Sequence, residues 1–143
     1  MKKGVVSVLL AMGFICGVVL GADVVEEKPA AVDAVLIVAD FAFCKSVANR
    51  EPVDKAELFA PEVGKVYFWT VITGAKEPAE VKHVWYYNNK KMFEISLPIK
   101  NPRHRTWSNK TIIPEWLGDW KVDVVDASGN VLKSAIFKIE KPK

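Results

Sequence analysis

The sequence predicts an all-β domain, an antiparallel immunoglobulin-like β-sandwich of about seven strands over residues 35–141. Two observations predict this fold class. Short runs of β-branched and aromatic residues recur along the region, and turn signals made of Gly, Pro, Asn and Asp separate them roughly every eight to twelve residues. Hardly any stretch has the period of an amphipathic helix. A small closed barrel is the alternative that this pattern leaves open.

The first half of the domain contains two predicted strands. Residues 35–44 form a β-rich run, and we expect Pro52 to stop it because proline cannot donate a hydrogen bond to a ladder. Residues 54–59 are expected to form a short helical turn or an irregular loop that tucks its last two apolar side chains inward. Residues 66–73 are continuously β-branched and aromatic between two glycines, which predicts a central strand.

The second half contains two predicted hairpins with a single strand between them. Asn88 and Asn89 tolerate positive φ and lie between two apolar runs, so they predict the first hairpin, whose ladder should end at Pro98 and Pro102. An Asp/Ser/Gly/Asn turn closes the second hairpin. The predicted strands are 81–87, 92–97, 105–112, 120–125 and 131–139.

Alternation within the strands predicts which side chains face the core. Trp120, Val122 and Val124 share one face of their strand, and the residues between them should face outward. Trp85 is expected to be buried between the sheets, as a tryptophan at this place is in immunoglobulin-like domains. These assignments give the terminal hairpin an inside and an outside.

The segment before the domain predicts export. Residues 1–22 are interpreted as a secretory leader, because two lysines precede an uncharged, mostly apolar stretch that ends in small residues. Residues 23–34 are polar and without period, which indicates a tether. Retention of the leader as a membrane anchor is the alternative, since the stretch approaches the minimum of about 17 residues for a span. With the leader removed, we expect a periplasmic or secreted protein of the bacterial cell envelope that is not an integral membrane protein.

Cysteine and charge limit the function classes. Cys44 would be the only thiol of the mature chain, so no intramolecular disulfide can form, and we expect this thiol to be buried. The sequence has 20 Lys and Arg against 17 Asp and Glu, so removal of the two leader lysines leaves a net charge of +1. This balance argues against a nucleic-acid binder. Basic residues nevertheless gather at positions 90–110, where Glu94 is the only acid, as a solvated face or an anion-facing patch.

Six basic or aromatic residues are candidate ligand contacts. Arg105 and Trp107 are two apart on a predicted strand and therefore share a face. Aromatic rings beside Arg and Asn are how sandwich modules hold sugars or extended peptides. Ordinary burial is the alternative for each aromatic ring, and a hydrogen-bonded histidine at the edge of the core is the alternative for His83. The candidates are His83, Arg103, Arg105, Trp107, Lys110 and Trp116.

Several short motifs occur in a recognisable order. They are FC at 43–44, NREPV at 49–53, VYFWT at 66–70, HVWYY at 83–87, RTWSNK at 105–110 and GDWKV at 118–122. In this combination the chain resembles the bacterial family called domain of unknown function 2914, over roughly residues 35–141. The resemblance implies an exported or membrane-tethered module and no mechanism.

No segment carries a motif typical of catalysis or of metal binding. The sequence lacks G-x-S-x-G, H-E-x-x-H and a Gly-rich phosphate loop, and Cys44, His83, Met92 and His104 lack the close spacing of zinc or copper ligands. We therefore expect no enzyme, no metal and no cofactor. The predicted function is an exported, non-enzymatic module that binds a protein segment or glycan of the cell envelope, and an anionic partner is one that the basic stretch would fit. A structural subunit without a ligand site and an enzyme of unrecognised type are the alternatives.

Overall fold

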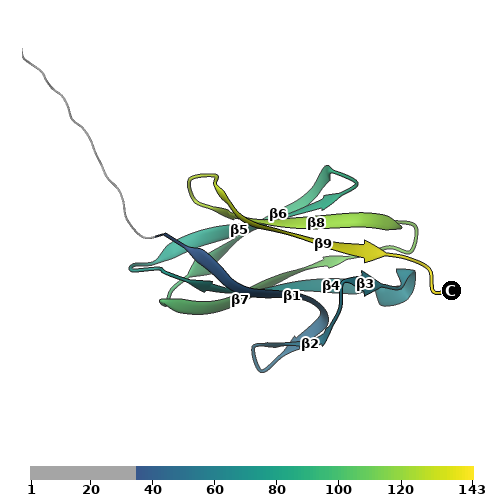
Figure 1. Ribbon diagram of the computed structural model, residues 1–143, viewed down its shortest axis with the longest axis horizontal. Coiled ribbons are helices and arrows are strands. Elements are labelled where there is room, and N and C mark those ends of the chain that lie inside the picture. The colour runs from purple at the N-terminus through teal and green to yellow at the C-terminus, as the bar shows by residue number, and fades with distance from the viewer. Residues whose placement is uncertain (1–34) are drawn as a thin grey trace, which may run out of the picture. The chain divides into compact units, whose positions relative to one another are not determined.

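The computed structural model describes residues 35–143, which form two facing β-sheets (Figure 1). In this part of the chain no helix is long and apolar enough to cross a membrane. The predicted leader (1–22) and tether (23–34) lie outside the described residues. The elements are β1 (Ile37–Ala48), β2 (Glu51–Lys55), β3 (Leu58–Phe59), the 3₁₀ helix η3 (Pro61–Val63), β4 (Lys65–Thr73), β5 (Ala79–Tyr87), β6 (Lys90–Ile99), β7 (Arg103–Thr111), β8 (Gly118–Asp126) and β9 (Val131–Ile139).

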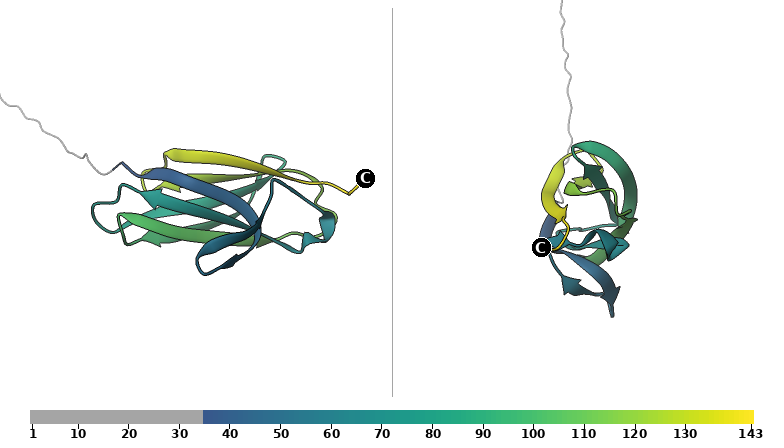
Figure 2. Two further views of the ribbon diagram at one scale, coloured as in Figure 1. Left: turned by 60° about the horizontal axis from the view of Figure 1, so that its bottom comes forward. Right: turned by 90° about the vertical axis from the view of Figure 1, so that its right-hand side faces the viewer.

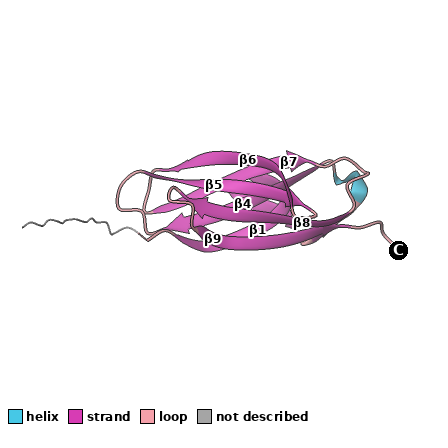
Figure 3. Cartoon of the chain, turned by 90° about the horizontal axis from the view of Figure 1, so that it is seen from above, coloured by secondary structure: helices cyan, strands magenta, loops and turns pink. Residues whose placement is uncertain are grey.

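The two sheets have the connectivity of an immunoglobulin-like sandwich. The four-stranded sheet has the order β2-β1-β4-β7, and the five-stranded sheet has the order β3-β9-β8-β5-β6. All pairings among the described strands are antiparallel except the short parallel pair of β3 with β9. Two further views show the layers side-on and from one end (Figure 2), and the view from above shows the strands running along the domain (Figure 3). The predicted fold class is confirmed, and β2 and β3 are the strands that the sequence did not predict.

The first strand continues beyond the point where we expected it to stop. β1 extends to Ala48, Asn49 and Arg50 turn the chain at φ 53° and 64°, and β2 returns along β1 with Pro52 in its ladder. Positive φ at both central residues is characteristic of a type I′ hairpin turn. Pro52 is tolerated because β2 is the edge strand of its sheet, where one side of the backbone needs no ladder partner.

Two further details of the prediction were wrong. Residues 54–59 complete β2 and form β3 instead of a helical turn, and only Phe59 is buried, whereas Leu58 is 56% exposed. Pro98 does not end its ladder, since it pairs with Glu80 and β6 continues to Ile99. β6 is also an edge strand, so the physical reason is the same as for the proline of β2.

The two predicted hairpins are confirmed. Asn88 and Asn89 adopt φ 47° and 68° between β5 and β6. Between β8 and β9, the Asp126 carboxylate accepts hydrogen bonds from the backbone N–H groups of Ser128 and Asn130, both at 2.9 Å. An aspartate that satisfies the backbone of its own turn stabilises that turn locally.

An aromatic core fills the space between the sheets. Trp85 on β5 is fully buried as predicted, and its ring centroid lies 6.0 Å from that of Phe137. Trp120 stacks on the same phenylalanine at 5.8 Å with an interplanar angle of 15°. Val122 and Val124 are buried with it, which confirms the predicted inner face of β8. Burial of each large apolar side chain contributes roughly 1.5–3 kcal/mol, so this interior is the main source of stability.

Candidate functional site

Alternation along β7 places three of the predicted site residues on the outer face of the four-stranded sheet. Thr106 and Ser108 are buried toward the other sheet, so Arg103, Arg105 and Trp107 point outward. Trp107 lies opposite Trp69 of β4 in the ladder. Arg105 and Trp107 are half-buried and Arg103 is exposed. The predicted shared face of Arg105 and Trp107 is therefore present.

This outer face contains a second apolar cluster, separate from the core. Cys44, Trp69 and Val71 are buried there, with Tyr67 and Trp107 packed against them. Cys44 is buried as expected, and burial raises the pKa of its thiol because the charged thiolate is disfavoured away from water. An indole as large as that of Trp69 is buried on an outward sheet face when another segment of the chain covers it.

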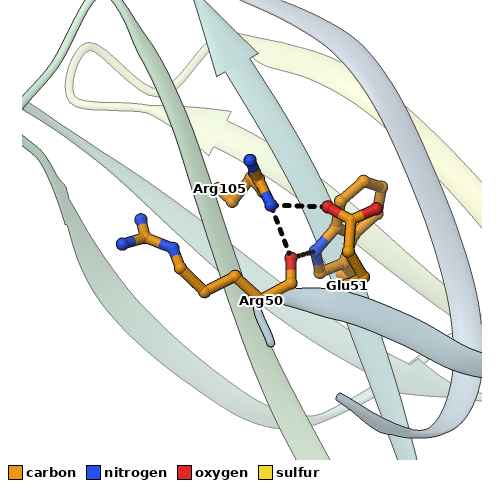
Figure 4. Close-up of polar contacts among 4 residues, drawn as sticks. Arg50, Glu51 and Arg105 are labelled. Carbon is orange, nitrogen blue, oxygen red and sulfur yellow. Dashed lines mark hydrogen bonds and ion pairs between the residues drawn. The ribbon is translucent and has the colours of Figure 1, made fainter. Parts of the chain in front are cut away.

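The covering segment is the β1–β2 hairpin, which we call the arm (residues 45–55). Its β2 is the edge strand of the four-stranded sheet, and the hairpin bends away from the five-stranded sheet (Figures 1 and 2). At its tip the Arg50 carbonyl accepts a hydrogen bond from Trp69 Nε1 at 2.9 Å and a longer one from Arg105 Nη1 at 3.4 Å. Arg105 Nη1 also donates to Glu51 Oε2 at 2.5 Å (Figure 4). One guanidinium on β7 thus holds both residues that begin the return strand of the arm.

The site is electropositive. Burial lowers the pKa of His104 below its ordinary value, and the nearby charges of Arg50 and Lys100 lower it further. The arm tip therefore brings the positive charge of Arg50 to the β7 side of the sheet. We call Arg50, Arg103 and Arg105 the basic face.

Lys110 and Trp116 do not belong to this face, which corrects the prediction. Lys110 is five residues from Arg105, and an odd separation puts it on the opposite side of β7. Its Nζ lies 5.0 Å from the ring centroid of Trp116 in a cation–π contact. Trp116 in turn packs against Tyr87 and Trp120, at centroid distances of 6.2 and 5.8 Å. Lys110 and Trp116 therefore form a separate structural pair.

His83 is enclosed between the sheets and does not meet Arg105 or Trp107 in a cleft. Its side chain has no exposed surface, so the alternative interpretation as a hydrogen-bonded histidine describes its position. Ser108 Oγ lies 2.7 Å from His83 Nδ1, and Thr70 Oγ1 lies 3.4 Å from Nε2. Trp85 Nε1 donates to the same Ser108 Oγ at 3.1 Å. These four side chains form a buried polar cluster that joins the two sheets.

The contacts of this cluster assign the imidazole tautomer. Thr70 donates its hydroxyl to the Thr106 carbonyl at 2.9 Å, so it can only accept from His83 Nε2. Nδ1 then accepts from the Ser108 hydroxyl, and every polar atom is satisfied with a neutral ring. Burial lowers the pKa of His83 to about 3, which agrees with this state.

The described residues offer little for catalysis or metal binding. The Ser108–His83 pair resembles a nucleophile and its base, but both side chains are buried and no substrate reaches them. Among residues 35–143, no group of three His, Cys, Asp or Glu side chains lies close enough together to hold a metal ion. What the arrangement can do is contact a partner at the outer face.

Sequence reasoning missed three members of the site: Arg50, Glu51 and Trp69. Trp69 and Arg50 are 19 residues apart, and Arg105 and Glu51 are 54 residues apart. No local pattern connects positions so distant. The one available signal was the hairpin turn at positions 49–50, because a chain that reverses there must bring residue 51 back over the sheet.

A comparison with known families tests the family resemblance that the motifs indicated. The family described as "Protein of unknown function (DUF2914)" matches residues 78–139. The resemblance to this family is confirmed over these residues. The match to DUF2914 spans β5 to β9 and is shorter than the 35–141 that the resemblance suggested. The matched region includes Arg103, Arg105 and Trp107, whereas the arm lies before it.

The other comparisons add little. No curated protein matches the sequence. Among solved structures, a crystal structure of selenomethionine-labelled β-glucosidase from Kluyveromyces marxianus is similar over 74% of this chain and 14% of that chain, at 15% identity and a TM-score of 0.39. The chain thus spans a small part of that enzyme, and a likeness this weak supports no conclusion about activity.

Proposed function

We propose that this protein is an exported, non-enzymatic module that binds a protein segment or glycan of the bacterial cell envelope through the outer face of its four-stranded sheet. The observation that carries the proposal is the pairing of half-buried Arg105 and Trp107 on that face, beside exposed Arg103. Export rests on the basic and apolar pattern of residues 1–22.

The chemistry of these side chains suits recognition. A guanidinium presents a planar fork of donors that matches a carboxylate or phosphate, and an indole offers a large rigid surface with little entropy to lose. Arg and Trp are also the residue types that most often dominate binding energy. Arg50 and Glu51 of the arm hold Arg105 from one side, so the side chain is partly ordered before a partner arrives.

A role without catalysis is supported by the position of the polar side chains. The Ser–His pair with the shortest contact lies inside the core, where it satisfies Trp85 and Thr70. The outward groups of β7 are arginines, a tryptophan, an asparagine and a threonine, which include no general base.

The test is the double change Arg105→Ala with Trp107→Ala. The chain offers a matched control on the other sheet, where Lys121 Nζ lies 4.7 Å from the ring centroid of Tyr86, so Lys121→Ala with Tyr86→Ala also removes one cation and one aromatic ring. Binding to separated glycan and protein fractions of the envelope is measured at two salt concentrations, with melting temperature as a check of folding. We expect only the first variant to lose binding while staying folded, and a steep salt dependence if the partner is anionic. Equal binding by all three proteins would refute the proposal.

A further inference from the structure

Arg105 already holds a carboxylate in the free protein. Its guanidinium receives Glu51 Oε2 and, beside it, the carbonyl of the preceding residue. The carbonyl belongs to the turn residue Arg50, at φ 64°, and the carboxylate to Glu51, the first residue of β2, so the guanidinium binds a backbone carbonyl and the carboxylate that follows it (Figure 4). A guanidinium that binds a carboxylate from the arm can also bind one from a partner.

The internal contact is easily exchanged. The side chains of Arg105 and Glu51 are 40% and 58% exposed. Exposed ion pairs contribute little because water screens the charges and both side chains lose freedom when they pair. Glu51 can therefore leave Arg105 at small cost, and an incoming carboxylate can take its place.

The basic face has more positive charge than Glu51 neutralises. Arg50 extends away from Glu51 in Figure 4, and among residues 35–143 neither Arg50 nor Arg103 has an acidic partner. Arg50 also adopts φ 64°, a left-handed conformation that favours glycine or asparagine over arginine. An arginine kept at a strained position suggests that its side chain is needed there.

β7 is an edge strand, which decides between a peptide and a glycan. It pairs only with β4, so its other edge offers backbone groups to an added strand. A segment added there would direct every second side chain to the outer face, alongside Arg103 and Arg105. A sugar chain cannot pair with a strand edge in this way.

We propose that the partner is an extended protein segment with acidic residues at alternate positions, which pairs along β7 and replaces Glu51 on Arg105. This inference rests on the proposed function and names its partner class. Glu51 is then an internal competitor that keeps the site occupied until the segment binds.

The experiment uses three probes and four proteins. The probes are a ten-residue peptide of alternating Glu and Thr, a peptide of the same composition with its Glu and Thr in two blocks, and a galacturonate oligomer. The proteins are the parent, Glu51→Gln, Asp54→Asn and Arg105→Gln. Asp54→Asn is the matched control, because it removes one negative charge from the same arm, lies at φ 59°, where asparagine is tolerated, and makes no ion pair with Arg105. Affinities are measured by calorimetry, and folding by melting temperature.

The expected result is binding of the alternating peptide in preference to the block peptide. Glu51→Gln should bind it up to about fivefold more tightly, as loss of an exposed ion pair allows, and Asp54→Asn should show less than half of that gain. Arg105→Gln should bind about tenfold more weakly, as loss of a charge-assisted hydrogen bond predicts.

Each of the following results would overturn the inference. Equal gains for Glu51→Gln and Asp54→Asn, or equal binding of the two peptides, would mean that only general electrostatics is at work. Binding of the galacturonate oligomer alone would make the site a glycan site. If no probe binds while envelope fractions are still captured through Arg105 and Trp107, the inference fails and the proposed function stands. If no probe binds and no envelope fraction is captured through Arg105 and Trp107, both the inference and the proposed function fail.

Discussion

The outer faces of the two sheets follow the same strand alternation but differ in chemistry. On the four-stranded sheet, the outward residues Trp69 and Val71 are buried because the arm lies over them. On the five-stranded sheet, the outward residues include Lys121 and Asp123, which pair at 3.8 Å, and no second apolar cluster forms among the described residues. On the five-stranded sheet Val84 and Asp123 are buried singly among their neighbours, so what the arm adds to the other face is a shielded cluster of aromatic side chains beside cationic groups.

The largest predicted effect on stability comes from the interior that both sheets share. It is the reference for the smaller effects expected at the two outer faces. The folded pKa of His83 is about 3, below its ordinary 6.5, so the folded protein binds fewer protons than the unfolded chain. Its contribution to stability is complete above pH 6.5 and is lost as the pH falls toward 3, by about 1.4 kcal/mol per pH unit and about 5 kcal/mol in all. Urea unfolding at a series of pH values measures this loss.

Two variants assign the pH dependence to its source. His83→Gln should flatten the dependence between pH 6.5 and 5, before carboxylates such as Glu94 and Asp126 titrate, since their pKa values are lowered from ordinary values of 4.5 and 3.8. His104→Gln should flatten it less, because that ring is only partly buried. A parent protein with constant stability over this range would contradict a neutral, enclosed His83.

Truncation of Trp69 should have the next largest effect and separates the two faces directly. Trp69→Ala should destabilise the fold by about 3 kcal/mol, because it opens a cavity beneath the arm and releases the Arg50 carbonyl. Tyr86→Ala, on the outer face of the five-stranded sheet, should cost less than about 1 kcal/mol. Chemical denaturation compares the two, and equal costs would mean that the arm does not shield its sheet.

The two hairpin turns give a smaller and opposite effect. Arg50→Gly should stabilise the protein by about 0.5–1 kcal/mol, because arginine is strained at φ 64° and glycine is not. Asn89→Gly, at φ 68° in the corresponding turn of the other sheet, should gain less, since asparagine already tolerates this region. The same denaturation assay measures both, and a stable Arg50→Gly protein that loses partner binding would separate fold from function.

The smallest effect belongs to the ion pairs of the five-stranded sheet. Glu94 pairs with Lys82 at 3.5 Å and with Lys91 at 2.7 Å. Because these groups are exposed, Glu94→Gln should leave the melting temperature unchanged within error, at low and at high salt. A clear loss of stability would show that the ion pairs on this face stabilise the fold.

Local patterns in the sequence predicted most of the fold. The alternation in residues 120–125 assigned the inner face of β8, and Asn88 with Asn89 located a hairpin, because each of these signals depends only on neighbouring residues. The arm was missed for the same reason. Arg50 is not a typical turn residue, and Pro52 was taken as a stop because nothing local says that β2 lies at an edge.

The candidate site was predicted in part. Arg105 and Trp107 were placed correctly on one face, since their separation of two residues fixes it. Lys110 was grouped with them by charge, although counting positions along the strand puts it on the other side. The ion pair of Arg105 with Glu51 depends on how two distant hairpins pack, which no short-range pattern encodes.

The position of β9 has a consequence for how the protein is made. This strand lies between β8 and the short β3, and it supplies Phe137 and Ile139 to the core. A nascent chain that has not yet released residues 131–139 cannot complete the five-stranded sheet, and pairing of β3 with β9 must close a loop of roughly eighty residues. Sheet formation of this kind is slow compared with helix formation, so the chain should stay unfolded while it is synthesised. The chain would therefore still be unfolded if it reached a translocation machinery that accepts only unfolded chains.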